Sequence, residues 1–166
     1  MTEHYENRAK EIVQRILYVT IASVSSDGIP WNTPVYSAYD NHANFYWTSS
    51  PQAQHSRNID SNTRVFLVIY DSTVAEGRGE GVYLEAAAAA LDDPAEIAEA
   101  RQNMARRVGK QFGPETDRLL ETGMQRIYRA TPNRVWMNGF ENDEKSYVRD
   151  IRVEIPVACL KGLVTW

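Results

Sequence analysis

The feature that most constrains this chain is a succession of short strand-like runs separated by turn signals. The run at residues 17–25 is rich in β-branched side chains, and the turn residues Ser26, Asp27 and Gly28 follow it. Further strand patterns occupy residues 31–39, 45–48, 64–70, 82–91, 124–130, 134–138 and 147–155. A series of about seven sequential strands, mostly linked as hairpins, favours an antiparallel barrel or sandwich.

Three of these strands carry more specific signals. The run at residues 64–70 is continuously apolar after Arg64, which predicts a central strand buried on both faces. Pro30 and Pro34 cannot donate ladder hydrogen bonds, so the strand that contains them is expected at an edge or a bulge. Five alanines at residues 86–90 suit a helix by propensity, but no helix start precedes them, and we expect a strand.

Helical spacing is confined to a few segments. An amphipathic helix is predicted at residues 3–16, and a short helix or helical loop at 51–60. Asp93 and Pro94 open another helix, which restarts over residues 114–122. Its apolar face is expected to contain Ile97, Met104, Ala105 and Val108. The chain shows no repeats or linkers, so residues 1–166 are expected to form one domain, with the apolar tail after Pro156 docked on it.

Composition excludes several classes of function. The net charge is -4 and the pI about 5.4, which argues against a nucleic-acid interface or a basic membrane-binding face. No apolar run is long enough to span a bilayer, and the polar N-terminus does not resemble a signal peptide. The single cysteine, Cys159, cannot form an internal disulfide. We therefore expect a cytoplasmic protein.

Common catalytic motifs are absent from the sequence. His4, His42 and His55 lie far apart and have no metal-ligand spacing, so no metal site is expected. No Gly-x-Ser-x-Gly elbow is present. The glycines at residues 77–81 lack dinucleotide-binding spacing and indicate a loop.

The order of motifs between residues 27 and 71 is more informative than any one motif. A turn and strand containing Thr33-Pro34-Val35 precede the aromatic strand Phe45-Tyr46-Trp47-Thr48-Ser49-Ser50, then the polar stretch Gln54-His55-Ser56-Arg57 and a buried strand. Later come Glu80-Gly81-Val82-Tyr83-Leu84 and a closing hairpin formed by residues 126–128 and 132–136. This order resembles the FMN-binding, pyridoxamine 5′-phosphate oxidase-like family of antiparallel split β-barrels with helical insertions.

The resemblance implies FMN bound in a groove between the subunits of a homodimer. The phosphate of FMN needs hydroxyl, main-chain and cationic donors. Those donors are expected from Thr48, Ser49, Ser50, Gln54, His55 and Arg57. The flavin ring is expected to lie along the strand that contains Asn32, Thr33, Pro34 and Val35. It is also expected to lie beside two tryptophans, Trp47 and, from the partner subunit, Trp136.

Each of these residues, taken alone, has a simpler structural interpretation. Trp47 and Trp136 fit equally well as core or interface aromatics, and the hydroxyl residues 48–50 as a turn. His55 and Arg57 fit as solvated residues of a surface helix.

The chain departs from the founding oxidase of the family at several positions. Gln54 and His55 stand where that enzyme has an Arg-Lys pair, and Thr33 and Ala38 replace an arginine and a lysine. The late Arg-x-His pair has no counterpart within residues 145–149. The departures predict a flavin-dependent oxidoreductase that acts on another small organic substrate or on a nicotinamide. A deazaflavin- or haem-binding relative and a non-enzymatic flavin protein remain alternatives.

Overall fold

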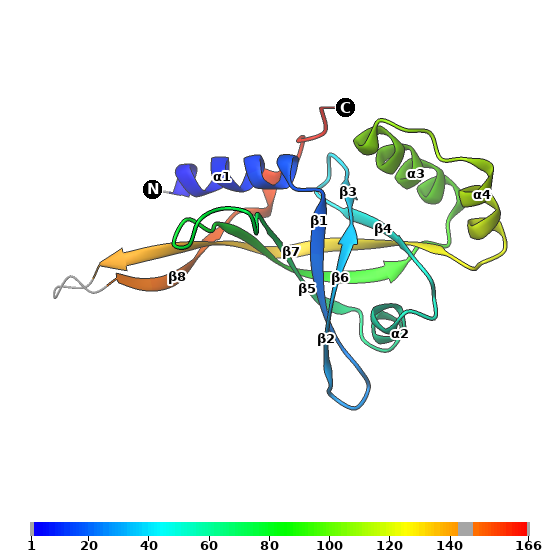
Figure 1. Ribbon diagram of the computed structural model, residues 1–166, viewed down its shortest axis with the longest axis horizontal. Coiled ribbons are helices and arrows are strands. Elements are labelled where there is room, and N and C mark those ends of the chain that lie inside the picture. The colour runs from blue at the N-terminus through cyan, green and yellow to red at the C-terminus, as the bar shows by residue number, and fades with distance from the viewer. Residues whose placement is uncertain (1, 143–147, 166) are drawn as a thin grey trace.

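The computed structural model describes residues 2–142 and 148–165. Its centre is one antiparallel sheet, curled into a half-barrel and flanked by helices (Figure 1). The eight strands are β1 (Tyr18–Val24), β2 (Pro30–Tyr36), β3 (Ala38–Tyr39), β4 (Phe45–Ser49), β5 (Arg64–Tyr70), β6 (Gly81–Ala90), β7 (Arg126–Asn142) and β8 (Val148–Ile155). The helices are α1 (Thr2–Arg15), α2 (Gln54–Ser61), α3 (Pro94–Val108), α4 (Pro114–Glu121) and the short 3₁₀ helix η1 (Val157–Leu160). The predicted mainly-β split-barrel class with helical insertions is confirmed.

The sheet is curled because its two edges are consecutive in sequence. The strands follow the order β2-β1-β5-β6-β7-β4-β3, and β8 pairs with β7. Between β2 at one edge and β3 at the other stands a single residue, Ser37. Ser37 is buried, and its N–H donates to the carbonyl of Leu17 at 3.0 Å. A flat sheet cannot satisfy a one-residue link between its edges, so the strands must wrap around a common interior.

The predicted hairpin within residues 126–136 is wrong, because these residues belong to one long strand. In β7, Glu85 of β6 pairs with Arg134 while Ala86 pairs with Pro132, so Asn133 is an extra residue in a β-bulge. Pro132 is tolerated there because a bulge interrupts the hydrogen-bond ladder. On its other side, β7 pairs with β4 through Ala130 and with β8 from Val135 onward. On this side β7 thereby pairs with two strands in succession, in addition to β6 on the other side.

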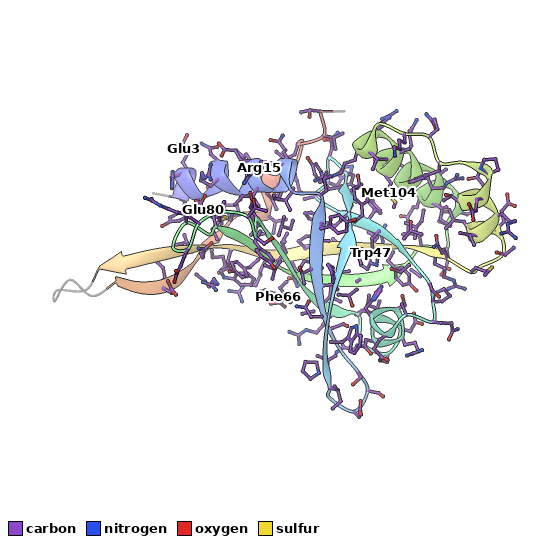
Figure 2. All side chains as sticks on the ribbon, in the orientation of Figure 1. Glu3, Arg15, Trp47, Phe66, Glu80 and Met104 are labelled. Atoms are coloured by element: carbon purple, nitrogen blue, oxygen red, sulfur yellow. The ribbon has the colours of Figure 1, made fainter. Side chains whose placement is uncertain are left out.

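The strand β5 is central, but it is not buried on both faces as its sequence suggests. Val65, Leu67 and Ile69 are buried in the core, whereas Phe66 and Tyr70 are 37% and 50% exposed. Figure 2 shows Phe66 on the side of the sheet away from α1. One face of the sheet therefore carries apolar side chains that no other described element covers.

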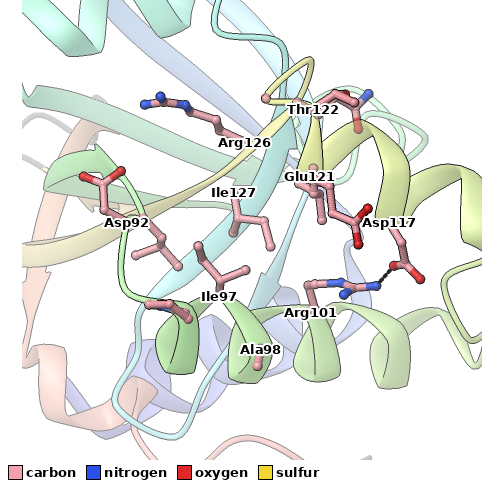
Figure 3. A pocket seen from close by; sticks show the side chains of 14 residues that line it. Asp92, Ile97, Ala98, Arg101, Asp117, Glu121, Thr122, Arg126 and Ile127 are labelled. Carbon is pink, nitrogen blue, oxygen red and sulfur yellow. Dashed lines mark hydrogen bonds and ion pairs between the residues drawn. The ribbon is translucent and has the colours of Figure 1, made fainter.

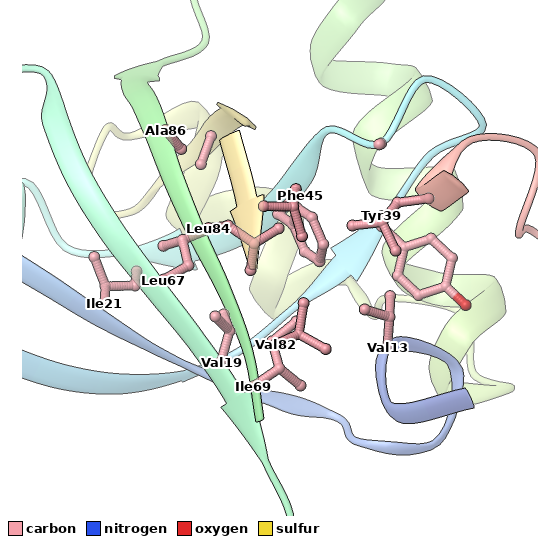
Figure 4. Packing of buried hydrophobic residues seen from close by; sticks show 14 of the residues in the cluster. Val13, Val19, Ile21, Tyr39, Phe45, Leu67, Ile69, Val82, Leu84 and Ala86 are labelled. Carbon is pink, nitrogen blue, oxygen red and sulfur yellow. The ribbon is translucent and has the colours of Figure 1, made fainter. Parts of the chain in front are cut away.

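The opposite face of the sheet encloses the core. Ile21, Leu67 and Leu84 lie on adjacent strands, and Val13 of α1, beside Tyr39, belongs to the same buried cluster (Figure 4). At the far end, the Trp47 indole is 0% exposed and stacks on Tyr128, with ring centroids 5.6 Å apart. The alternation of buried residues along each strand follows from the period of two of a pleated sheet.

The helices α3 and α4 form an insertion between β6 and β7. As predicted, Asp93 caps α3, accepting a hydrogen bond from Glu96 N at 2.9 Å. Gly109 ends the helix in the left-handed region, with φ of 64°. Arg107 donates to the carbonyls of Val13 and Ile16 at 2.9 and 2.7 Å, which fastens α3 to the end of α1.

The C-terminal segment also matches expectation in the residues described. Pro156 ends β8, and Leu160 and Leu163 are buried against the core. Tyr147 and Trp166 lie outside the described residues. None of the helices within the described ranges has the length and apolar character that a membrane crossing needs.

Replacing the buried indole tests its structural role. W47A is expected to lower the free energy of unfolding by about 3–5 kcal/mol, because it leaves a cavity at the Tyr128 stack. W47F should cost less, since it keeps a ring and removes an indole N–H that has no hydrogen-bond partner among the described residues. Urea denaturation measures both, with exposed Met124→Ala as the control. Equal stability of W47A and M124A would contradict a core role for Trp47.

Candidate functional site

A surface cleft of about 470 Å³ lies where the ends of β2 and β4 meet α2 and the helical insertion. We refer to it as the β2–β4 cleft. Its lining combines hydroxyl, aliphatic and aromatic side chains: Thr33, Pro34, Val35, Tyr36, Thr48, Ser49, His55, Met104, Val108, Phe112, Thr116 and Gln125. Six of the predicted cofactor residues, from three separate segments, therefore line one cleft.

The strand β2 forms one wall because it lies at the sheet edge. Its register with β1 pairs Thr20 with Pro34, and β2 pairs with no other strand in the described ranges. Main-chain groups on the free side of an edge strand are available to a ligand. Asn32 is exposed farther along β2, opposite Ala22, and does not line the cleft.

Ser49 and His55 form the polar end of the cleft. Ser49 is the last residue of β4, and its Oγ lies 2.8 Å from Nε2 of His55 on α2. The His55 side chain is buried, and burial lowers the pKa of its imidazole below the usual 6.5. The ring is therefore neutral at pH 7, and its Nε2 is hydrogen-bonded to the Ser49 hydroxyl. The neighbouring Thr48 faces α3, with its Oγ1 3.9 Å from Met104 Sδ.

Three other predicted phosphate ligands have their polar atoms engaged elsewhere. Arg57 donates to Gln52 O and to Gln54 Oε1, both at 2.7 Å. The Gln54 amide in turn donates to Asn58 at 2.8 Å. Ser50 Oγ accepts from Gln52 N at 3.1 Å in the turn before α2. None of the three lines the β2–β4 cleft.

The two predicted tryptophans do not line the cleft either. Trp47 has no exposed surface for a ligand, so it is removed from the candidate site and assigned to the core. Trp136 lies on the outer face of the sheet, stacked on Phe66 at 6.0 Å between ring centroids. The Arg134 guanidinium lies 4.5 Å from the centre of the Trp136 ring. A contact between Trp136 and a ligand of the partner subunit stays a prediction.

The wall that the helical insertion contributes to the β2–β4 cleft was not predicted from the sequence. Met104 and Val108 were predicted as the apolar face of α3, but not as cleft residues. Phe112 lies between α3 and α4, Thr116 lies in α4, and Gln125 directly precedes β7. No local signal marks them, because contact between them and β2 depends on how the insertion folds back over the sheet.

The chemistry of the β2–β4 cleft is that of a binding site for a planar, partly apolar ligand. Among the described residues, its lining contains no Asp, Glu, Lys or Arg. Hydroxyls and a neutral imidazole can hydrogen-bond to a ligand, while Val35, Met104 and Phe112 can pack on it. Within the described ranges, no group of three or more His, Cys, Asp and Glu could hold a metal ion.

A second, larger cavity of about 700 Å³ lies between the insertion and β7 (Figure 3). Ile97 and Ile127 form its apolar floor, and an ion pair between Arg101 and Asp117 crosses one end. Gln125 lines both this cavity and the β2–β4 cleft.

Comparison with known sequences identifies the family. The sequence profile of pyridoxamine 5′-phosphate oxidase matches residues 5–139. The chain belongs to the pyridoxamine 5′-phosphate oxidase family. No curated protein sequence matches it.

Solved structures share the fold of this family member at low sequence identity. HutZ, the heme storage protein from Vibrio cholerae, is 21% identical with a TM-score of 0.64, over 76% of this chain and 89% of HutZ. A heme binding protein from Mycobacterium smegmatis is 18% identical with a TM-score of 0.65, over 92% of this chain and 60% of that one. Campylobacter jejuni ChuZ is 12% identical with a TM-score of 0.71, over 94% and 64%.

The buried imidazole predicts a pH dependence of stability. Because the folded-state pKa of His55 is lowered, the unfolded chain takes up its proton first as the pH falls through about 6.5. The contribution of the His55 imidazole to the free energy of unfolding is therefore present at pH 7.5 and is lost toward pH 5.5. The difference in unfolding free energy between wild type and H55Q should therefore shrink over that range. Exposed His42→Gln is the control, and an H55Q curve parallel to wild type would contradict burial of a neutral imidazole.

Proposed function

We propose that the protein is an FMN-dependent oxidoreductase acting on a small organic substrate or a nicotinamide, with the flavin in the β2–β4 cleft. The observation that carries this proposal is the convergence of β2, the end of β4 and α2 on one cleft. These are the three segments from which the family resemblance expects cofactor contacts.

The residues present fit the ring of a flavin. Thr33, Pro34 and Val35 offer an edge strand along which a planar ring can lie, with main-chain groups for its heteroatoms. Met104 and Phe112 supply apolar surface on the opposite side. When bound, the flavin supplies the two-electron chemistry. The protein binds it, orients it and keeps water from one face of the ring.

The aromatic face of the sheet supports a homodimer. The rings of Phe66, Tyr83 and Trp136 lie side by side on adjacent strands. On the same outer surface of the sheet, Tyr18 is 59% exposed and Tyr70 is 50% exposed. Contiguous apolar surface of this kind marks an association site. Two-fold pairing of this face would bury it on both subunits and complete two equivalent cofactor sites.

Haem is the second candidate ligand for the same cleft. Its support is the uncharged lining with one buried neutral imidazole, His55, together with the two structural relatives that are described as heme proteins. A protein of this kind would bind or store the group without turning over. The absorption spectrum of the purified protein separates flavin, deazaflavin and haem, and reduction by NADH or NADPH separates a reductase from a storage protein.

Titration with FMN tests the main proposal. The apo-protein should quench flavin fluorescence with a dissociation constant in the micromolar range or tighter, equivalent to about -8 kcal/mol. S49A should weaken binding by roughly 10-fold, because it removes a hydroxyl donor and the partner of His55. S72A, in an exposed loop, is the matched control. Unchanged flavin fluorescence when the protein is in about 100-fold excess over the flavin, at roughly 100 μM protein, would rule out FMN.

The dimer is tested by removing its central aromatic side chain. W136A should weaken self-association and FMN binding together, because the same side chain is assigned to the interface and to the partner's cofactor. Light scattering of the wild type should give a mass of twice 18.9 kDa. Exposed V74A is the control and should change neither property. A wild-type monomer that binds FMN at full affinity would exclude the shared site.

A further inference from the structure

The larger cavity between the helical insertion and β7, which we call the insertion cavity, is separate from the proposed cofactor site. Its volume of about 700 Å³ lies in the range of small-molecule sites. Its apolar walls come from Leu91, Ile97, Leu120 and Ile127, of which Leu91 and Ile127 are buried. Apolar walls combined with a few charged groups are typical of a ligand pocket.

Strand register brings two opposite charges to one end of the insertion cavity. Beyond the last ladder pair of β6 and β7, the N–H of Leu91 still donates to the carbonyl of Ile127 at 2.8 Å. The next position of the same register sets Asp92 opposite Arg126, and both residues line the cavity. Opposite residues of an antiparallel pair project from the same face, so a carboxylate and a guanidinium share one wall.

Asp92 and Arg126 are both available to a ligand. Each is exposed, and neither makes a hydrogen bond or an ion pair with any residue in the part of the chain that the structure describes. They also form no ion pair with each other, although they are opposite in register. A ligand with a positive and a negative group on neighbouring atoms would satisfy both charges at once.

The other end of the insertion cavity sets the character of the rest of the ligand. There, Glu121 lies beside the ion pair between Arg101 and Asp117, so two carboxylates face one guanidinium (Figure 3). The excess negative charge disfavours a second acidic group on the ligand. Between the two ends, Ile97 and Ile127 offer an apolar floor on which a hydrocarbon side chain can pack.

We propose that the insertion cavity is a binding site for an apolar α-amino acid. The ligand carboxylate binds Arg126, its ammonium group binds Asp92, and its side chain packs on Ile97 and Ile127. Gln125 lines both this cavity and the β2–β4 cleft, so the amino acid is a neighbour of any cofactor in the cleft. Binding at this site does not require that cofactor, and it stands apart from the proposed oxidoreductase activity.

Ligand-observed NMR with L-leucine and the flavin-free protein tests the site. L-Leucine should bind with a dissociation constant of about 1 mM or tighter. Glycine and L-aspartate should bind at least about 10-fold more weakly, because they lack the apolar side chain. No binding at roughly 20 mM L-leucine, or equal binding of L-leucine and glycine, would overturn the proposal. Failure of FMN to bind would leave these results unaffected.

Two analogues that each lack one charge assign the two head-group contacts. L-Leucinamide has no carboxylate and isocaproate has no ammonium group, so both should bind wild type roughly 10-fold more weakly than L-leucine. R126Q should weaken L-leucine binding to within about two-fold of L-leucinamide, because the carboxylate contact is gone. D92N should likewise bring L-leucine to within about two-fold of isocaproate.

Matched charge removals outside the cavity control for general effects of charge. Arg78 and Glu76 are exposed in the loop between β5 and β6, and neither lines the insertion cavity. R78Q and E76Q should leave L-leucine affinity within about two-fold of wild type. Thermal unfolding of each variant checks that the exposed substitutions leave the fold intact. Unchanged L-leucine affinity in R126Q or D92N, or an equal loss in the control variants, would remove the assigned contacts.

Discussion

The architecture depends on a single-residue connection. Ser37 joins β2 and β3, which are the opposite edges of the sheet, and it is held by a hydrogen bond to Leu17. With this link fixed, the strands between the edges must curl. The same curl brings β2 beside the end of β4, two segments that the sheet order places far apart. The β2–β4 cleft is thus a geometric result of closing the sheet, because the same closure positions both of these walls.

The long strand β7 is the second element on which the arrangement depends. Its bulge at Asn133 lets the first part of β7 pair with β4, while the second part pairs with β8. Because the bulge changes which face each later residue occupies, Tyr128 points into the core while Trp136 reaches the outer face. One strand therefore contributes both to the core and to the aromatic outer surface.

Much of the fold could be predicted from local sequence, because periodicity and turn chemistry act over a few residues. The strand at Arg64–Tyr70 and the cap at Asp93 are examples. Residues 126–136 were predicted as a hairpin instead of one bulged strand, since whether a proline follows a turn or occupies a bulge depends on partner strands that the sequence does not reveal. For the site, Ser49 and His55 were predicted because a strand end rich in hydroxyls is followed closely by a polar helix, an order that resembles the family. The pairing of Ser49 with β7 depends on register, the contact of Thr48 with Met104 of α3 depends on insertion packing, and no local pattern encodes either.

The contacts of Arg107 couple α3, which lines the β2–β4 cleft, to α1, which covers the core. Its guanidinium binds carbonyls of α1 and stacks on Tyr39, with 4.5 Å to the ring centre, while the adjacent Val108 lines the β2–β4 cleft. Displacement of α3 by an occupant of the cleft would therefore be transmitted to the C-terminal turn of α1. A fluorophore or spin label on the solvent side of α1 would then report occupancy from a position outside the cleft. The helix could serve as a built-in attachment point for a biosensor.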